Sequence, residues 1–278
     1  MIASIGELVL DVTITPEGPL LVDDDRDASV QIGGGGQAAN FCAWAASLGE
    51  HARLITKVGD DEAGRRLVSD IEAAGVQVMA VRGPEPTGAV AVLVGDGGTR
   101  SFARQRGAAV GLRTQELTPA WFDGVRLLHV PAYSLFQEPL AASARRAVDL
   151  TRARGGLISI DLSSAADLRA YGGARMAADL AGLKPELVFA TESEVTEVGA
   201  PLRGLAKVPV VKLGARGCLV FGRRIPAPQV HAVDSTGAGD AFAAAFCVAY
   251  LEGATPPEAA GRAVLVAAAA AAKWGARP

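Results

Sequence analysis

The chain has 278 residues and a formal net charge of −3 at pH 7, with 50% hydrophobic and 5% aromatic residues. A chain of this length and apolar content can bury a large core, which excludes a disordered or fibrous protein. Lys and Arg are spread without a basic block, which argues against nucleic-acid binding. No basic leader opens the sequence, and its most apolar stretch, residues 264–272, is far shorter than the roughly 20 residues that span a bilayer. We therefore expect a cytoplasmic globular protein.

The cysteines and histidines indicate neither a disulfide framework nor a metal site. Cys42, Cys218 and Cys247 are odd in number, far apart and set among apolar residues, so we interpret them as small core residues. The three histidines show none of the spacings that bind zinc, and structural roles are expected for them as well. No metal cage built from side chains is predicted.

Short apolar runs alternate with helical patterns along most of the chain. The runs predicted as buried strands are residues 54–58, 127–130, 157–160, 187–190 and 208–213. Helices are predicted over residues 41–48, 65–74, 139–152, 192–198, 238–251 and 257–273. This alternation is typical of βαβ units and predicts a mostly parallel sheet. No linker divides the chain, so we expect a single domain over residues 1–278.

Two segments interrupt the alternation. Residues 12–32 and 87–106 hold β-branched or alternating residues without a helical period, and turn signals occur at residues 16–19 and 95–98. Segments of this kind favour strands joined by tight turns. We predict that they pair into a small antiparallel sheet away from the main one.

Four glycines at residues 33–36 precede the helix predicted over residues 41–48. Glycine allows backbone to approach within contact distance of a ligand, so this run is a candidate binding turn. The alternative is a structural crossover with no ligand, because such turns are common.

The same stretch also fits a loose G-x-G-x-x-A dinucleotide pattern through Gly33, Gly35 and Ala38. A dehydrogenase fingerprint should follow the first core strand and find an acidic residue near the tip of the next strand, about 20 residues on. Here the following strand runs into Lys57, and the segment before the glycines belongs to the predicted small sheet. The chain also has no G-x-x-x-x-G-K-[ST] motif, so any ATP site is not a P-loop.

The most informative run is Val233-Asp234-Ser235-Thr236-Gly237-Ala238-Gly239-Asp240-Ala241-Phe242. Its residues Gly237, Ala238 and Gly239 carry at most a methyl group, so their backbone N–H groups can close on an oxyanion. The apolar helix that follows directs the positive end of its dipole at the same place, with Asp240 in its first turn. The run indicates a phosphoryl-transfer site. The alternative is an ordinary glycine-rich turn in which Asp240 only complements the helix dipole.

At this run the chain resembles the PfkB family, the ribokinase-like carbohydrate kinases. The family signature reads Asp-Thr-Thr-Gly-Ala-Gly-Asp-x-Phe, and Ser235 replaces the first Thr. Residues 33–49 resemble the family's N-terminal signature, a glycine pair followed by Asn40 and an Ala-rich helix that closes with Leu-Gly. Weaker matches follow in the family's order at residues 5–11, 57–65, 86–88 and 211–217.

The resemblance implies a three-layer α/β/α ribokinase-like fold with a small β-sheet lid, formed by about residues 12–32 and 87–106. It implies transfer of the γ-phosphate of ATP, with Mg²⁺, to a hydroxyl of a small carbohydrate. An Asp of ordinary pKa, about 3.9, suffices as the base because the hydroxyl loses its proton late in a loose transition state. A homodimer formed through the lid is also implied.

The resemblance also assigns roles to individual residues. The catalytic group comprises the base Asp240 and the N–H groups of Gly237, Ala238 and Gly239. The sugar is assigned to Asp11, Gly35, Gly36 and Asn40, with Arg106 as a further substrate residue. The nucleotide is assigned to Thr191, Lys212, Gly214 and Gly217. Mg²⁺ is assigned through water to Glu194, and a K⁺ site to Asp234 and Thr236.

Several positions depart from the family pattern. Thr191 stands where the family's Asn-x-x-Glu element has Asn, Ser163 replaces the Asn of an Asp-x-Asn element, and Lys212 replaces Thr. These changes leave the nucleotide preference open.

Few residues indicate which kind of acceptor such a kinase would phosphorylate. The first glycine signature carries Gln37 where relatives that act on sugar phosphates have Lys, which favours a neutral acceptor. The segment around Arg104 and Arg106 resembles the 2-keto-3-deoxygluconate kinases, but Ala165 stands where their second Arg would be. The alternatives are therefore a nucleoside kinase or a sugar-acid kinase. Outside the class they are a nucleotide-linked dehydrogenase or a non-catalytic sugar sensor.

Overall fold

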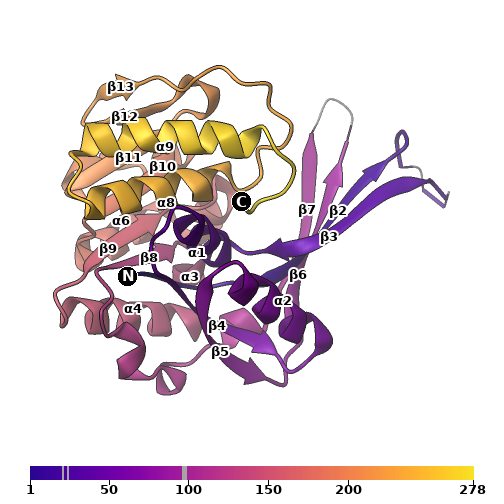
Figure 1. The fold of residues 1–278 in the computed structure, drawn as a ribbon, viewed down its shortest axis with the longest axis horizontal. Helices are drawn as coiled ribbons and strands as arrows, with labels where there is room; N and C mark the ends of the chain where they lie inside the picture. The colour runs from indigo at the N-terminus through magenta and orange to yellow at the C-terminus, as the bar shows by residue number, and fades with distance from the viewer. Residues whose placement is uncertain (21, 24, 96–98) are drawn as a thin grey trace.

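A nine-stranded sheet in the order β13-β12-β11-β10-β9-β8-β1-β4-β5 forms the centre of the computed structural model, which describes residues 1–20, 22–23, 25–95 and 99–278 (Figure 1). Its strands are β1 (Ile2–Ile5), β4 (Ala52–Gly59), β5 (Val76–Gly83), β8 (Leu127–Pro131), β9 (Leu157–Asp161), β10 (Leu187–Thr191), β11 (Val208–Lys212), β12 (Cys218–Val220) and β13 (Arg223–Ile225). The pairs from β5 to β11 are parallel, and β12 and β13 add an antiparallel edge. The five apolar runs predicted as strands all lie in this sheet, because strands covered on both faces need apolar residues throughout.

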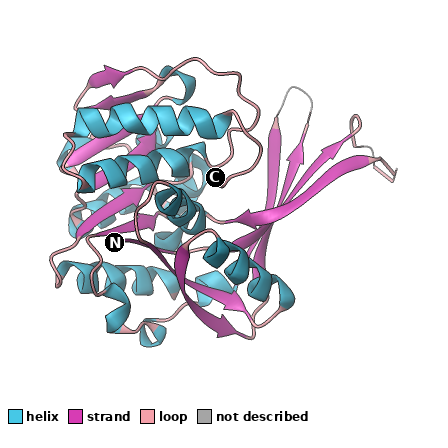
Figure 2. Ribbon diagram, viewed as in Figure 1, coloured by secondary structure: helices cyan, strands magenta, loops and turns pink. Residues whose placement is uncertain are grey.

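Helices cover both faces of the sheet, which confirms the predicted three-layer α/β/α class (Figure 2). One hydrophobic cluster packs four helices, α1 (Gln37–Ser47), α2 (Glu62–Ala73), α8 (Ala238–Leu251) and α9 (Pro256–Ala271). The second cluster packs α3 (Tyr133–Phe136), α4 (Leu140–Arg152), α5 (Ala165–Tyr171), α6 (Gly173–Leu183) and α7 (Glu192–Val198). Short 3₁₀ turns occupy residues 108–111, 114–116, 119–122, 202–204 and 214–216.

A separate four-stranded sheet, here called the lid, projects from one side of the molecule (Figure 1). Its order is β3-β2-β6-β7, with bounds β2 (Val9–Pro16), β3 (Ala28–Gly35), β6 (Thr87–Val94) and β7 (Arg100–Gly107). The expected antiparallel sheet is wrong in one respect, since β2 and β6 pair in parallel. The reason is that each continues a strand of the parallel central sheet, β1 and β5, in the same direction. Most of the turn predicted at residues 95–98 lies outside the described residues.

The lid also begins earlier than the sequence predicted. The expected opening strand over residues 5–11 breaks at Gly6, where φ is +153° and a Cβ would lie 2.6 Å from Ser134 Oγ. Asp11 therefore belongs to lid strand β2 and not to the first core strand. The predicted glycine turn is likewise mostly strand, since β3 ends at Gly35 and only Gly36, with φ 98°, turns the chain into α1.

Candidate active site

The start of α8 lies at the carboxyl end of the central sheet, beside the base of the lid (Figure 1). Gly237 precedes the helix with φ 75°, and among the described residues no side chain caps this end. The first N–H groups of a helix lack partners within the helix and carry the positive end of its dipole. Lys212 lies beside this turn, since a Cβ on Gly239 would be in ordinary contact, 3.5 Å, with Lys212 Nζ. The predicted Gly237, Ala238 and Gly239 thus form a site that suits an anion.

Asp240 stands in the first turn of α8 and accepts a hydrogen bond of 3.0 Å from Asn40 Nδ2 on α1. Burial raises the pKa of Asp240 to about 7, and the charge of Asp161 adds to this effect. Hydrogen bonds from Asn40 and Gln37 and the charge of Lys212 act in the opposite direction. The ordinary aspartate pKa assumed from the sequence is therefore wrong for the ligand-free site, because the sequence does not show the burial of this carboxylate. A carboxylate with a pKa near neutral is well matched to act as a base.

Lys212 forms a buried ion pair at the ends of three neighbouring strands. Its Nζ donates to Asp161 Oδ2 at 2.6 Å, and the Asp161 side chain is fully buried. Burial opposes the charge on Lys212, but Asp161 and Glu194 outweigh it and raise the pKa of the ammonium. The lysine is therefore charged at neutral pH and lies beside the start of α8. The ammonium lies next to Gly239, so it brings positive charge to the same place as the N–H groups at the start of α8.

Glu194 and Thr191 cap α7 reciprocally. Glu194 Oε2 accepts from the backbone N–H of Thr191 at 2.7 Å, and Thr191 Oγ1 accepts from the N–H of Glu194 at 3.3 Å. Glu194 is buried, and its pKa is raised by this burial and by the charge of Asp161. The pairing of Thr191 with Lys212 across β10 and β11 brings both positions to the same edge. Across residues 1–20, 22–23, 25–95 and 99–278, no three His, Cys, Asp or Glu side chains cluster to hold a metal ion.

The two glycines assigned to the nucleotide differ in their surroundings. At Gly217 the fold itself requires glycine, since φ is +94° and a Cβ would overlap the carbonyl oxygen of Ile225. Gly214 opens the turn after β11 with φ +60°, and a Cβ there would have no atom within 4 Å. Gly214 therefore leaves free space beside the strand that carries Lys212.

The residues assigned to the sugar meet at the base of the lid. A Cβ on Gly35 would overlap the Asp11 carboxylate, and one on Gly36 would overlap the carbonyl oxygen of Glu7. Glycine at these positions lets the backbone lie against the Asp11 carboxylate at Gly35 and against the Glu7 backbone at Gly36. That the same glycines let the backbone approach a sugar stays a prediction. Burial raises the pKa of Asp11 to about 6, with Arg277 opposing the shift and Glu7 adding to it.

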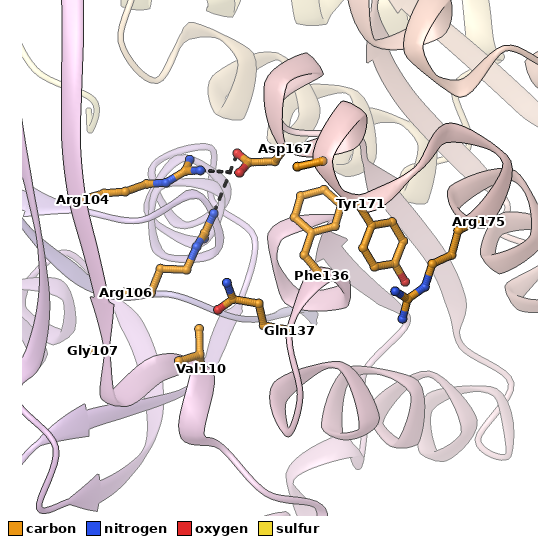
Figure 3. A pocket seen from close by; sticks show the side chains of 10 residues that line it. Arg104, Arg106, Gly107, Val110, Phe136, Gln137, Asp167, Tyr171 and Arg175 are labelled. Atoms are coloured by element: carbon orange, nitrogen blue, oxygen red, sulfur yellow. Dashed lines mark hydrogen bonds and ion pairs between the residues drawn. The ribbon is translucent and has the colours of Figure 1, made fainter.

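A cavity of about 550 Å³ lies between lid strand β7 and helices α3 and α5 (Figure 3). Arg104 from β7 is paired with Asp167, and Arg106 is paired with Glu7. The guanidinium of Arg106 also lies 4.4 Å from the centre of the Tyr133 ring. The predicted substrate residue Arg106 thus lines the cavity. Its ion pair with Glu7 links it to the residues assigned to the sugar, because the Glu7 backbone lies against Gly36. The aromatic rings of Phe136 and Tyr171 and the guanidinium of Arg175 also line the cavity.

The pair assigned to K⁺ has a structural role in the loop before α8. Asp234 Oδ1 accepts from the backbone N–H of Thr236 at 2.7 Å, and Asp234 Oδ2 accepts from that of Gly275 at 3.1 Å. These bonds tie the loop to the C-terminal segment. The same segment carries a residue that the sequence analysis missed, Arg277, whose Nε donates to Asn40 Oδ1 at 3.1 Å.

An open helix start, a lysine beside it and a buried aspartate in its first turn define a phosphotransferase that acts on a hydroxyl group. The chain belongs to the pfkB family of carbohydrate kinases, whose family model matches residues 1–278. It is 34% identical over 260 residues to an ATP-dependent ribose-1-phosphate kinase of Halopiger xanaduensis, covering 90% of this chain and 84% of that protein. It is 29% identical over 265 residues to fructokinase-1 of Oryza sativa, covering 88% and 81%.

The fold agrees with this membership. The crystal structure of adenosine kinase from Sinorhizobium meliloti matches with a TM-score of 0.89 and 24% identity, covering 100% of this chain and 95% of that one. Family membership removes the dehydrogenase alternative, since these kinases are phosphotransferases with hydroxyl acceptors. Within the described part of the chain, every helix is too short or too polar to cross a bilayer.

Proposed function

We propose that this protein is an ATP-dependent, Mg²⁺-requiring kinase that phosphorylates a hydroxyl of a small neutral carbohydrate. The observation that carries the proposal is the position of Asp240 at the open start of α8, next to the charged Lys212. Phosphoryl transfer needs mainly positioning and charge stabilisation, which this arrangement supplies.

The residues around α8 suit the phosphates of ATP. The N–H groups of Gly237, Ala238 and Gly239 and the ammonium of Lys212 provide positive charge at one place. Mg²⁺ supplies further charge neutralisation between the phosphates and is held mostly by oxygen ligands and water. Glu194 is the carboxylate proposed to organise that water, and Thr191 and Gly214 border the nucleotide.

The acceptor is proposed to lie between the lid base and Asp240. Asp11 accepts hydrogen bonds from its hydroxyls, Gly35 and Gly36 let the backbone approach it, and Asn40 bounds it next to Asp240. Asp240 takes the proton of the attacking hydroxyl, and the N–H groups of α8 stabilise the charge that grows on the transferred phosphoryl group.

The lid arginines support a neutral acceptor. Arg104 and Arg106 each already have a carboxylate partner, Asp167 and Glu7. An anionic acceptor would have to displace these carboxylates or lie against them, and repulsion between like charges at close range is unfavourable. Both arginines therefore help to hold the lid against the body of the protein.

A phosphorylated sugar is the second candidate, because one observation favours it. Three arginines, Arg104, Arg106 and Arg175, line the cavity beside the acceptor site, and guanidinium groups bind phosphate well. The relative from Halopiger xanaduensis is named for such a substrate. A nucleoside is the third candidate, supported by the likeness to the adenosine kinase structure.

The deciding experiment compares kcat/KM for fructose, ribose, adenosine, ribose 1-phosphate and 2-keto-3-deoxygluconate with MgATP. We expect the highest value for one of the two neutral sugars. A clear preference for either anionic compound would overturn the neutral assignment, and Arg106→Gln should then lose most of that preference. Replacing K⁺ by Na⁺ in the same assay tests the proposed K⁺ site at Asp234 and Thr236.

We further propose that two copies associate through the lid. Val30 and Ile32 on edge strand β3 are 55% and 56% exposed. They share one face of the lid because residues two apart on a strand point the same way. Exposed apolar residues on a projecting sheet favour a partner surface.

A further inference from the structure

The C-terminal segment passes between α1 and the start of α8. Trp44 Nε1 on α1 donates to the carbonyl oxygen of Ala276 at 3.0 Å. A Cβ on Gly237 would overlap the same carbonyl, so the segment lies directly against the turn that opens α8. Together with the bond from Gly275 to Asp234, these contacts fix the backbone that carries Arg277.

Arg277 reaches from this segment to the base of the lid. Its Nη2 donates to the carbonyl oxygen of Gly35 at 2.9 Å, and its Nε donates to Asn40 Oδ1 at 3.1 Å. The side chain is half-buried, and it lies under Gly34, where a Cβ would overlap the guanidinium. Two hydrogen bonds to neighbouring groups hold the guanidinium in one orientation.

These contacts determine which way the amide of Asn40 faces. A guanidinium has only donors, so the atom of Asn40 that meets Arg277 must be the carbonyl oxygen. The amide nitrogen then points to Asp240, and its distance to Asp240 Oδ2 is 3.0 Å. With the opposite orientation, an NH₂ group would face the guanidinium and a carbonyl oxygen would face the carboxylate, and both contacts would be unfavourable.

Gln37 shows the same arrangement one turn earlier on α1. Its Oε1 accepts from Ser163 Oγ at 2.6 Å, and its amide lowers the pKa of Asp240 as that of Asn40 does. Both side-chain amides of α1 therefore favour the charged form of Asp240, each with its carbonyl oxygen held by another donor. This repetition indicates that the orientation of the amides serves the carboxylate.

We propose that Arg277 is a positioning residue, which orients the Asn40 amide so that it donates to Asp240 and holds this carboxylate in the charged, proton-accepting form. Hydrogen bonds to the charged form of a carboxylate favour that form. Arg277 acts through Asn40 and does not itself contact the reacting atoms. The charged groups that face Asp240 are Asp161 on β9, Lys212 on β11 with Glu194 behind it, and Arg277 itself, which also interacts with Asp11 on β2.

The test measures the protonation of Asp240 directly in the ligand-free protein. Aspartate labelled with ¹³C at its carboxyl carbon is titrated by NMR, and the Asp240 signal is assigned by its loss in Asp240→Asn. The variants are Arg277→Met, which removes all donors, and Arg277→Lys, which keeps the charge and one donor nitrogen. Each is also made together with Asn40→Ala. Arg152→Met is the matched control, since Arg152 donates to the backbone carbonyls of Leu183 and Lys184 away from the site.

We expect Arg277→Met to raise the pKa of Asp240 by about 1 to 2 pH units, which is the change produced by losing one hydrogen bond to the charged form. Arg277→Lys should restore part of this shift, and Arg152→Met should cause none. In the Asn40→Ala background, Arg277→Met should add only a small further shift, the part that comes from losing the charge of the guanidinium. An unchanged pKa in Arg277→Met, or a full shift that persists without Asn40, would overturn the inference, since the guanidinium would then act by charge alone.

The kinetic meaning of this inference rests on the proposed function, but its test needs no substrate. If the titration behaves as expected and no sugar is phosphorylated, only the proposed function fails. If sugars are phosphorylated and the Asp240 titration ignores Arg277, only the positioning role fails.

Discussion

Asp240 combines a raised pKa with a place beside a site that suits an anion, and both properties fit the base proposed here for a sugar hydroxyl. Replacing it by Asn keeps the size of the side chain and the start of α8 but removes the ability to take a proton. We expect Asp240→Asn to lower kcat by at least about 10²-fold, the lower end of what general acid–base groups supply. Binding of ATP and sugar, measured by calorimetry, should stay within a few-fold. A kcat close to that of the unmodified protein would remove Asp240 from the role of base.

The same burial should make Asp240 a cost to stability. Its pKa is near 3.8 in the unfolded chain and about 7 in the folded one, so between these values the folded state binds the proton more tightly. Stability is then highest below the lower value and falls as the pH rises through the higher one. We expect the gain in unfolding free energy from Asp240→Asn, measured in urea, to be larger at about pH 8 than at about pH 5.

This comparison needs a control for the loss of any negative charge. Asp60→Asn removes a carboxylate whose side chain is 71% exposed, and it should show little of this pH dependence. The buried His129 gives the unfolding free energy a pH dependence of the opposite sign, because burial lowers its pKa to about 3. This contribution is the same in all three proteins, so it cancels when each variant is compared with the unmodified protein. A gain from Asp240→Asn that is equal at both pH values would contradict the raised pKa.

At the scale of elements, the start of α8 depends on a close contact with the C-terminal segment. Gly237 has φ +75° and a Cβ there would overlap Ala276, whereas Gly253, beyond the end of the same helix, has φ +95° and open space around it. Gly237→Ala should therefore cost about 1–3 kcal/mol more in unfolding free energy than Gly253→Ala, because both carry the backbone strain and only one carries the overlap. It should also weaken MgATP binding. Equal losses in urea unfolding would show that the contact is easily relieved.

Sequence reasoning succeeded where the signals are local. The ends of α7 and α8 agree with the prediction, because the first has a reciprocal Thr191 and Glu194 cap and the second opens on a glycine turn. It failed at residues 33–35, where glycines that resemble a turn are strand, because pairing with β2 decides their conformation. Strand β5 and helices α5 and α6 were not predicted.

Only some residues of the candidate site could likewise be predicted from the sequence. Glycine and aspartate positions of the two signatures could be placed from the sequence. The Lys212–Asp161 pair and the Arg277–Asn40 contact join residues 51 and 237 positions apart. Only the order of the strands and the path of the C-terminal segment bring them together, and no local pattern carries that information.

At the scale of the whole molecule, the proposed dimer depends on the exposed apolar face of the lid. Changing both Val30 and Ile32 to Asp should convert the proposed dimer to a monomer in sedimentation analysis, since charges would replace the exposed apolar face. Phe102→Asp is the matched control. It is 61% exposed but lies on the opposite face, in the row of Val92 and Thr13. Dissociation by Phe102→Asp alone, or a monomer before any change, would contradict the assignment of this face.

The central claim is that this fold transfers the γ-phosphate of ATP to a sugar hydroxyl with Asp240 as base. The measurement that tests it most directly is ³¹P NMR of the purified protein with MgATP and a neutral sugar, run beside Asp240→Asn. The account predicts that ADP and a new phosphomonoester appear together in equal amounts, at least about 10²-fold more slowly with the variant. Formation of ADP and inorganic phosphate without a phosphomonoester, or equal rates for the two proteins, would contradict it.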